Sequence, residues 1–191
     1  MTDKYQVLVC DPPWAYSDCN TGGSFKSGSK QHYTTLKPDT IGKMKVANIM
    51  DDDAVLFLWI TVPLLDKGFE VLRNWDFTYK TMITWYKVDA QTRIGRLGLG
   101  RYFRGMTEHC LIGIRGEVKP FACQMQNVIV EKPRKHSQKP ERIWEMVNIA
   151  LRNHNMNNRI ELFCRGEPRL GFVGWGNQCE GSRKVELDLI C

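Results

Sequence analysis

Three features are absent from this 191-residue sequence, and each absence excludes a class of protein. No run of eighteen or more apolar residues occurs, so we expect no membrane-spanning helix and no membrane partner. The first residues lack the basic and long apolar stretches of a secretory signal, so we expect a cytoplasmic protein. The seven cysteines form no CxxC pair and are odd in number, which favours reduced thiols over a disulfide framework or a metal site.

The composition allows a globular protein with a basic surface. Hydrophobic residues make up 42% of the chain, and its length predicts one domain over residues 1–191. The net charge is +6, and basic residues gather in two stretches, 93–104 (RIGRLGLGRYFR) and 131–139 (EKPRKHSQK). Solvated surface is the ordinary explanation of such clusters; a polyanionic partner is the alternative.

Apolar stretches alternate with segments of helical periodicity along the chain. Strands are expected at 5–10, 54–60, 79–86, 109–116, 127–131, 159–165 and 172–178, and helices within 38–50, 63–75 and 139–153. Continuous apolar strands alternating with helices predict an α/β fold, a mostly parallel sheet with helices on both faces. Ligands bind such sheets at the carboxyl ends of the strands. Asp11, Lys87, Arg165 and Asn177 lie at or after such ends, so we expect them at one edge of the sheet.

The most specific local feature is the corner CDPPW at residues 10–14. Prolines fix φ and have no N–H, so the main-chain carbonyls here are expected to face outward without local donors. Together with the Asp11 carboxylate they would accept both hydrogens of a planar amine, while Trp14 forms a flat apolar wall. Acceptors placed this way free the nitrogen lone pair for attack on a methyl donor. The structural alternative is a Pro-Pro turn with a capping aspartate and a core tryptophan.

This corner is similar to the [DNS]-P-P-[YFW] motif of amino methyltransferases, and DPPW resembles the adenine-N6 methyltransferase family in particular. That family includes the catalytic subunit that methylates eukaryotic messenger RNA and bacterial and phage relatives that act on DNA adenine. Further blocks match in the same order: VLFLWIT (55–61), ITWYK (83–87), EHCLIGIRG (108–116), SQKP (137–140), RIELFCR (159–165) and GNQ (176–178). The resemblance implies a Rossmann-like class I methyltransferase fold with circularly permuted motifs, the catalytic corner first and the cofactor strand last.

The same resemblance implies the ligands and the site residues. It implies S-adenosylmethionine as cofactor, S-adenosylhomocysteine as product, and no metal. Catalysis is carried over to Asp11, Pro12, Pro13 and Trp14. Substrate contacts are carried over to Tyr33 of a mobile loop, to Trp59, Trp85 and Lys87, and to Glu108, Arg93, Arg96, Arg101 and Arg104 in a second loop. Cofactor contacts are carried over to Cys10, Asp11, Lys139, Phe163, Arg165, Asn177 and Gln178.

Each carried-over residue has a simpler structural alternative. Trp59 lies in an apolar strand and is equally explained as core, and Phe163 is explained by packing. Lys139 is explained as a solvated lysine at a helix start, and the Asn177–Gln178 pair as a turn. The sequence also departs from the family pattern, since Cys164 stands where glycine is usual in the Phe-Gly-Arg block.

The function favoured by the sequence is methylation of adenine N6 in single-stranded or base-flipped DNA, in a bacterial cell or a phage-infected host. Methylation of RNA is the close alternative. A non-catalytic nucleic-acid-binding scaffold subunit is a second alternative, which the intact DPPW corner disfavours. A protein amide or small amine as acceptor is a third, which the basic stretches disfavour. The stretch 93–105 also suits contact with a homodimer or heterodimer partner.

Overall fold

The computed structural model describes residues 4–16, 35–92, 94–98, 102–134 and 138–189. Its first half contains β1 (Tyr5–Cys10), α1 (Pro38–Gly42), α2 (Val46–Ile49), β2 (Met50–Thr61), the 3-10 turn η2 (Val62–Leu64), α3 (Leu65–Asn74) and β3 (Thr78–Lys87). Its second half contains β4 (Thr107–Arg115), β5 (Val128–Glu131), α4 (Arg142–Leu151), β6 (Arg159–Leu162), β7 (Arg165–Gly166), β8 (Val173–Trp175) and β9 (Gln178–Cys179). The strands at 5–10, 54–60, 79–86, 109–116 and 127–131 therefore agree with prediction within a few residues.

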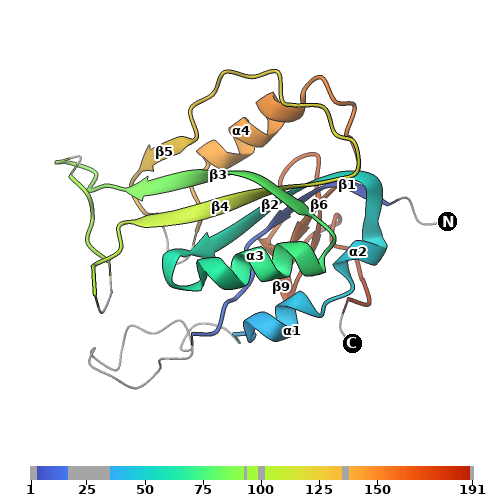
Figure 1. Cartoon of the computed structure of the whole chain (residues 1–191), viewed down its shortest axis with the longest axis horizontal. Helices are drawn as coiled ribbons and strands as arrows, with labels where there is room; N and C mark the ends of the chain where they lie inside the picture. Colours follow the sequence, from blue (N-terminus) through green and yellow to red (C-terminus); the bar gives the residue numbers. More distant parts are fainter. Residues whose placement is uncertain (1–3, 17–34, 93, 99–101, 135–137, 190–191) are drawn as a thin grey trace.

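Seven strands form one twisted sheet in the order β5-β3-β4-β2-β1-β6-β8 (Figure 1). β1 pairs in parallel with β2 and β6, β3 with β5, and β6 with β8. β4 runs antiparallel to both of its neighbours, β2 and β3. Six strands therefore point in one direction, which confirms the predicted mostly parallel, Rossmann-like α/β fold. The reversal of β4 places its first residues at the edge where the other strands end.

Helices cover both faces of the sheet, as the apolar strands require. In β1, Leu8 faces a core completed by α1 and α3, whereas Val7 and Val9 face a core completed by α4. Figure 1 shows α1 and α3 on one side of the sheet and α4 on the other. Gly68 of α3 allows close packing on the sheet, since a Cβ there would lie 3.0 Å from the Ile60 side chain.

Several predicted boundaries are wrong, for local reasons. The helix expected over 38–50 is two short helices, because after the first helix the Met44 N–H donates to the Ile41 carbonyl, three residues back, and leaves the four-residue spacing of an α-helix. The strand expected over 159–165 stops at Leu162, because Phe163 adopts φ 59°, a left-handed conformation that a strand does not allow. The strand expected over 172–178 is divided into β8 and β9.

The C-terminal segment lies along β8. A single bridge joins Gly174 to Lys184, and Leu189 is fully buried in the core on the α1 side. Within the described ranges, no helix has the length and apolar character needed to cross a membrane.

Candidate active site

The fold brings four charged side chains to the edge where the parallel strands end. Asp11 follows β1, Lys87 is the last residue of β3, and Lys139 lies just before α4. Glu108 joins them because β4 is antiparallel, which places this residue opposite Thr61 and Trp85 at the ends of their strands. The expectation that Glu108 lies in a loop is therefore wrong, since it is the second residue of a central strand.

These four side chains form a continuous chain of alternating charge, which we call the charge cluster. The Lys139 Nζ donates to Asp11 Oδ2 at 2.8 Å and lies 3.3 Å from Glu108 Oε2. Lys87 donates to the other oxygen of Glu108. Two ammonium groups thus balance two carboxylates in a largely buried place, which is the arrangement that makes burial of charge tolerable.

The two carboxylates of the charge cluster differ in acidity. Burial raises the pKa of Asp11 above its ordinary value, and the attraction of Lys139 only partly opposes this. Burial also disfavours the Glu108 carboxylate, but Lys139 and Lys87 together hold the pKa of Glu108 below its ordinary value. For Lys139, burial favours the neutral amine, but the two carboxylates raise its pKa above the ordinary range. Asp11 is therefore the more basic of the two carboxylates.

Trp59 and Trp85, the two tryptophans predicted as pocket walls, pack against the lysines of the charge cluster. Trp59 and Trp85 are buried, and their rings meet edge to face with centroids 6.4 Å apart. Lys139 Nζ lies 5.6 Å from the Trp59 ring centroid and Lys87 Nζ lies 4.9 Å from that of Trp85, within cation–π range. Each ring is buried with an ammonium group of the charge cluster next to it, so neither ring forms an open wall, and their contact with substrate stays a prediction.

The DPPW corner also differs from expectation. The Trp14 N–H donates to the Pro12 carbonyl at 2.9 Å, and the Leu36 N–H donates to the Pro13 carbonyl at 2.8 Å, so both carbonyls have local donors. Each carbonyl keeps a second lone pair for a ligand. Trp14 is buried rather than an open wall, because its indole N–H finds an internal acceptor, the Trp59 carbonyl, at 2.9 Å.

The residues on either side of segment 17–34, which lies outside the described residues, are held next to the DPPW corner. Ala15 donates to the carbonyl of Leu36, and the hydroxyl of Tyr16 lies 2.6 Å from that of Thr61 at the end of β2. The candidate substrate residue Tyr33 lies outside the described residues, as do the candidates Arg93 and Arg101. The other two candidate arginines, Arg96 and Arg104, are described and exposed.

A hollow of about 470 Å³ opens at the carboxyl end of β8. It is lined by Trp175, Gly176, Asn177, Lys184, Glu186 and Leu187. Phe163 packs edge to face on Trp175 with centroids 5.7 Å apart. Of the predicted cofactor residues, Asn177 thus lines the hollow, and Phe163 lies behind its wall. The sequence analysis did not predict that Trp175 and Lys184 line this hollow. The position of Trp175 directly before the GNQ block was the sequence feature that could have indicated it.

Gln178 and Arg165 are paired and exposed in the small β7–β9 sheet. Cys10, in contrast, points into the core on the α1 and α3 side, and burial raises the pKa of its thiol. Its side chain is therefore not available to a ligand. Glu161 lies in β6, where buried and partly exposed residues alternate, and burial raises the pKa of its carboxyl.

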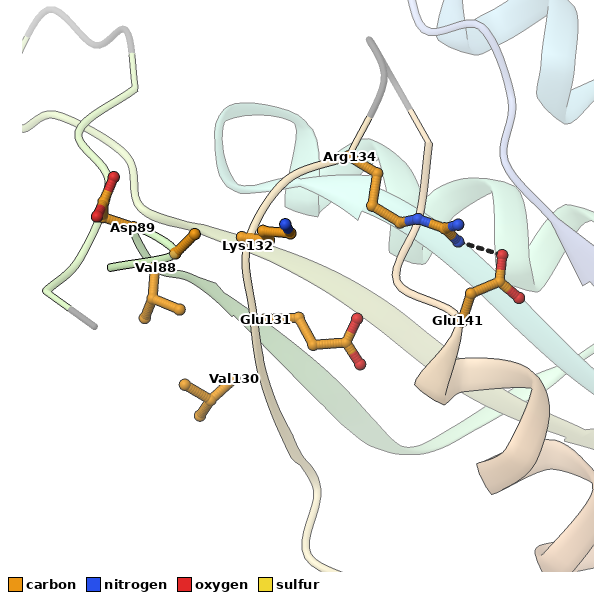
Figure 2. A pocket seen from close by; sticks show the side chains of 8 residues that line it. Val88, Asp89, Val130, Glu131, Lys132, Arg134 and Glu141 are labelled. Atoms are coloured by element: carbon orange, nitrogen blue, oxygen red, sulfur yellow. Dashed lines mark hydrogen bonds and ion pairs between the residues drawn. The ribbon is translucent and has the colours of Figure 1, made fainter. Parts of the chain in front are cut away.

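A second hollow, of about 360 Å³, lies at the carboxyl ends of β3 and β5 (Figure 2). Its lining consists of Val88, Asp89, Ala90, Val130, Glu131, Lys132, Arg134 and Glu141. Figure 2 shows Arg134 reaching across to Glu141, with which it forms an ion pair; Arg169 binds the same carboxylate at 2.6 Å. The basic stretch around residue 134 is therefore partly neutralised. Neither hollow includes Asp11. Asp11 follows β1, and in the sheet β1 lies between β8, where the first hollow opens, and β3 and β5, where the second hollow lies.

The described residues contain no group of three or more His, Cys, Asp or Glu side chains arranged to hold a metal ion.

The mostly parallel sheet covered by helices and the order of the motifs together indicate a Rossmann-like methyltransferase fold. Comparison with known proteins identifies the family, since the MT-A70 family model matches residues 5–178. The chain therefore belongs to the MT-A70 family of N6-adenine methyltransferases, as the sequence motifs predicted.

The relatives differ in length. The human N(6)-adenosine-methyltransferase catalytic subunit METTL3 is 30% identical over 192 residues, which cover 98% of this chain and 30% of METTL3. The type II methyltransferase M.MunI of Mycoplasma sp is 30% identical over 191 residues, which cover 91% of this chain and 76% of M.MunI. The chain thus spans less than a third of METTL3 but most of M.MunI.

Proposed function

We propose that this protein transfers a methyl group from S-adenosylmethionine to the exocyclic N6 amine of adenine in DNA. The observation that carries the proposal is the Asp11–Lys139 pair at the carboxyl ends of the sheet, beside the DPPW corner. Family membership supports the reaction, and the similarity to M.MunI over most of both chains supports DNA as the substrate. We propose residues 1–191 as one catalytic domain acting in the cytoplasm, where its nucleic-acid substrate lies.

The site residues fit the proposed cofactor. An α-amino acid carries an ammonium and a carboxylate, and Asp11 and Lys139 present the opposite charges 2.8 Å apart. Lys139 would bind the carboxylate and Asp11 Oδ2, the oxygen that faces Lys139, would bind the ammonium, which leaves Asp11 Oδ1 for the adenine amine. The hollow beside Trp175 and Asn177 offers an aromatic wall and an amide to the adenosine half, with Arg165 and Gln178 at the neighbouring strand pair.

When bound, S-adenosylmethionine supplies an electrophilic methyl group on sulfur. The protein's part is to orient the adenine amine and to stabilise the positive charge that develops on its nitrogen. Asp11 accepts one N–H of the amine, and the Pro12 carbonyl accepts the other through its remaining lone pair. Because burial raises the pKa of Asp11, this carboxylate is a stronger proton acceptor than an exposed one. Asp11 therefore both favours the charged nitrogen and accepts its proton.

In duplex DNA the target base has to leave the stack, at a cost of a few kcal/mol, and this cost is lowest for single strands. RNA methylation is the alternative substrate choice, supported by the similarity to METTL3. A non-catalytic scaffold is disfavoured because Asp11, Lys139 and Asn177 are all placed at one sheet edge.

Methyl transfer from radiolabelled S-adenosylmethionine to single-stranded DNA, duplex DNA and RNA oligomers tests the proposal. Asp11→Ala is expected to lower transfer at least about 100-fold, the range for loss of one preorganised transition-state contact. Asp52→Ala, at an exposed aspartate near the start of β2, is the matched control and is expected to retain activity. Equal transfer by Asp11→Ala and wild type refutes the catalytic role of Asp11.

Calorimetric titration with S-adenosylhomocysteine separates the enzyme from the scaffold. A catalytic domain binds it, and Lys139→Met weakens the binding. A wild-type protein that shows no binding heat and transfers no methyl group to any of the three oligomers overturns the proposed function.

A further inference from the structure

The second hollow lies on the opposite side of the reaction site from the hollow beside Trp175. In the sheet, β5 and β3 are on one side of β1, and β6 and β8 are on the other. The hollow proposed for the adenosine half of the cofactor opens at β8, and Asp11 follows β1. The second hollow, at β3 and β5, is therefore available to a part of the substrate that lies beside the target base.

The second hollow adjoins the charge cluster through two neighbouring strands. Lys87, which binds Glu108, is the register partner of Glu131 at the ends of β3 and β5. Neighbouring strands lie about 4.8 Å apart, so Glu131 is one strand spacing from the cluster. Its main chain is also fixed, because the Glu131 carbonyl accepts the indole N–H of Trp85 at 3.0 Å and the N–H of Val88 at 3.3 Å. The Glu131 side chain therefore extends from a fixed position beside the reaction site.

Most charged side chains of the second hollow already have partners. Glu141 binds Arg134, and the Asp89 carboxylate accepts two main-chain N–H groups of its own loop. Within the part of the chain that the structure describes, the Glu131 carboxylate and the Lys132 ammonium have no such partner. Figure 2 shows both side chains between Asp89 on one side and Arg134 and Glu141 on the other. The hollow thus offers one acceptor group and one cation to a ligand.

The size and the lining of the second hollow suit a nucleic-acid base. Its volume of about 360 Å³ lies in the range of small-molecule sites, about 300–1,000 Å³. Val88, Ala90 and Val130 give it apolar surface for the flat face of a base. A phosphate group would be attracted by Lys132 but repelled by Glu131, so the sugar–phosphate backbone fits this place less well than a base does.

The two charges also distinguish among the bases. A carboxylate only accepts hydrogen bonds and an ammonium only donates them. Guanine presents two adjacent donors, N1–H and N2–H, to Glu131, and its O6 acceptor to Lys132. Adenine and cytosine place a ring acceptor beside their amino group, and thymine and uracil have a single donor between two acceptors. In a single strand these base edges are open to the protein.

We propose that the second hollow binds a guanine base next to the target adenine, and that Glu131 determines this preference. The inference rests on the proposed function, because it presupposes a nucleic-acid substrate that contains the target adenine. It adds a base-specific contact beside the site, whereas the DPPW corner and the charge cluster serve the target base and the cofactor.

Single-stranded oligomers that contain one adenine test the proposal when the neighbouring bases are varied. For wild type we expect kcat/KM to be on the order of 10- to 100-fold higher with guanine at one neighbouring position than with any other base. Inosine, which lacks the N2 amino group, should lose most of this advantage. The same series in DNA and in RNA separates a preference for the base from a preference for the sugar.

Glu131→Gln is the informative variant, because the amide keeps the shape of the carboxylate and puts a donor in place of one acceptor. We expect its kcat/KM on guanine-containing oligomers to fall to the level of the other oligomers. Glu117→Gln, at an exposed glutamate beyond the far end of β4, is the matched control and should keep the preference. Urea unfolding and titration with S-adenosylhomocysteine should give the same values for wild type and both variants, which separates base recognition from a structural role.

Fluorescence anisotropy of labelled oligomers with S-adenosylhomocysteine present gives a second readout, because the guanine preference should also appear in Kd. Equal kcat/KM for all neighbouring bases in wild type overturns the inference, and so does a guanine preference that persists in Glu131→Gln. A wild-type preference for a different base contradicts the assignment of guanine. If wild type binds and methylates none of the oligomers, the proposed function itself fails, and this inference fails with it.

Discussion

Replacing Lys139 by methionine isolates the energetic role of the charge cluster. Methionine keeps the length and apolar stem of the lysine and removes only the ammonium group. Asp11 then loses its 2.8 Å partner and Glu108 its 3.3 Å partner, although Glu108 keeps Lys87. Asp11 is therefore the carboxylate left without a close cation from the cluster.

The expected loss follows from this geometry. Removing one partner of a buried ion pair costs about 3–5 kcal/mol, because the remaining charge is left uncompensated. The side chains of Lys139 and Asp11 are 15% and 28% exposed, so solvent screens part of this charge. We therefore expect Lys139→Met to lower the free energy of unfolding by about 2–4 kcal/mol at pH 7.5.

The difference in free energy of unfolding between wild type and Lys139→Met should become smaller at lower pH. Burial already raises the pKa of Asp11 in the folded wild type, and removal of Lys139 raises it further. A carboxyl group whose folded pKa exceeds its unfolded pKa binds protons more readily when folded, so the stability of the variant rises as pH falls through that window. Adding Asp11→Asn, which removes the charge at every pH, should recover most of the loss in the double variant.

Urea unfolding of wild type, Lys139→Met and the double variant at pH 7.5 and 5.0 measures these differences. Lys132→Met replaces an exposed lysine seven residues earlier and should stay within about 0.5 kcal/mol of wild type. The reasoning is wrong if Lys139→Met lowers the free energy of unfolding no more than Lys132→Met does, or lowers it equally at both pH values. In either case the Lys139 ammonium would not stabilise the ionised Asp11 carboxylate.

Three further predictions concern the packing around the site. Trp14→Phe leaves the buried Trp59 carbonyl without its 2.9 Å donor and should lower the free energy of unfolding by about 1–3 kcal/mol in urea; an unchanged midpoint contradicts this role for the indole N–H. Gly174→Ala should destabilise by about 1–3 kcal/mol in the same assay, because its Cβ would lie 2.5 Å from a proline side chain; wild-type stability would show that this neighbour yields freely. Cys110 is buried, and burial raises the pKa of its thiol, so mass spectrometry after treatment with a maleimide should find it unmodified in the folded protein while Cys123 is modified; equal labelling contradicts the described burial.

The sequence by itself determined the elements and the family. Apolar runs such as 54–60 bury on both faces only in a covered sheet, so the α/β class followed from local pattern. The ordered blocks from DPPW to GNQ identified the family without any coordinates. The strand-end rule correctly predicted that Asp11, Lys87 and Asn177 lie at the same sheet edge.

Only the tertiary structure decided what the aromatic and charged residues of the corner contact. The sequence predicts open walls at Trp14 and Trp85, but their indole N–H groups donate to main-chain carbonyls 45 and 46 residues away in sequence, and no local pattern reveals such partners. Likewise, the apolar pattern of 109–116 predicts a strand but not its direction. The antiparallel course of β4 brings Glu108 to Lys87 and Lys139, and so completes the charge cluster around Asp11. Strand direction and long-range pairing depend on the whole packed chain, which is why the sequence named the parts of this site and the fold determined how they act together.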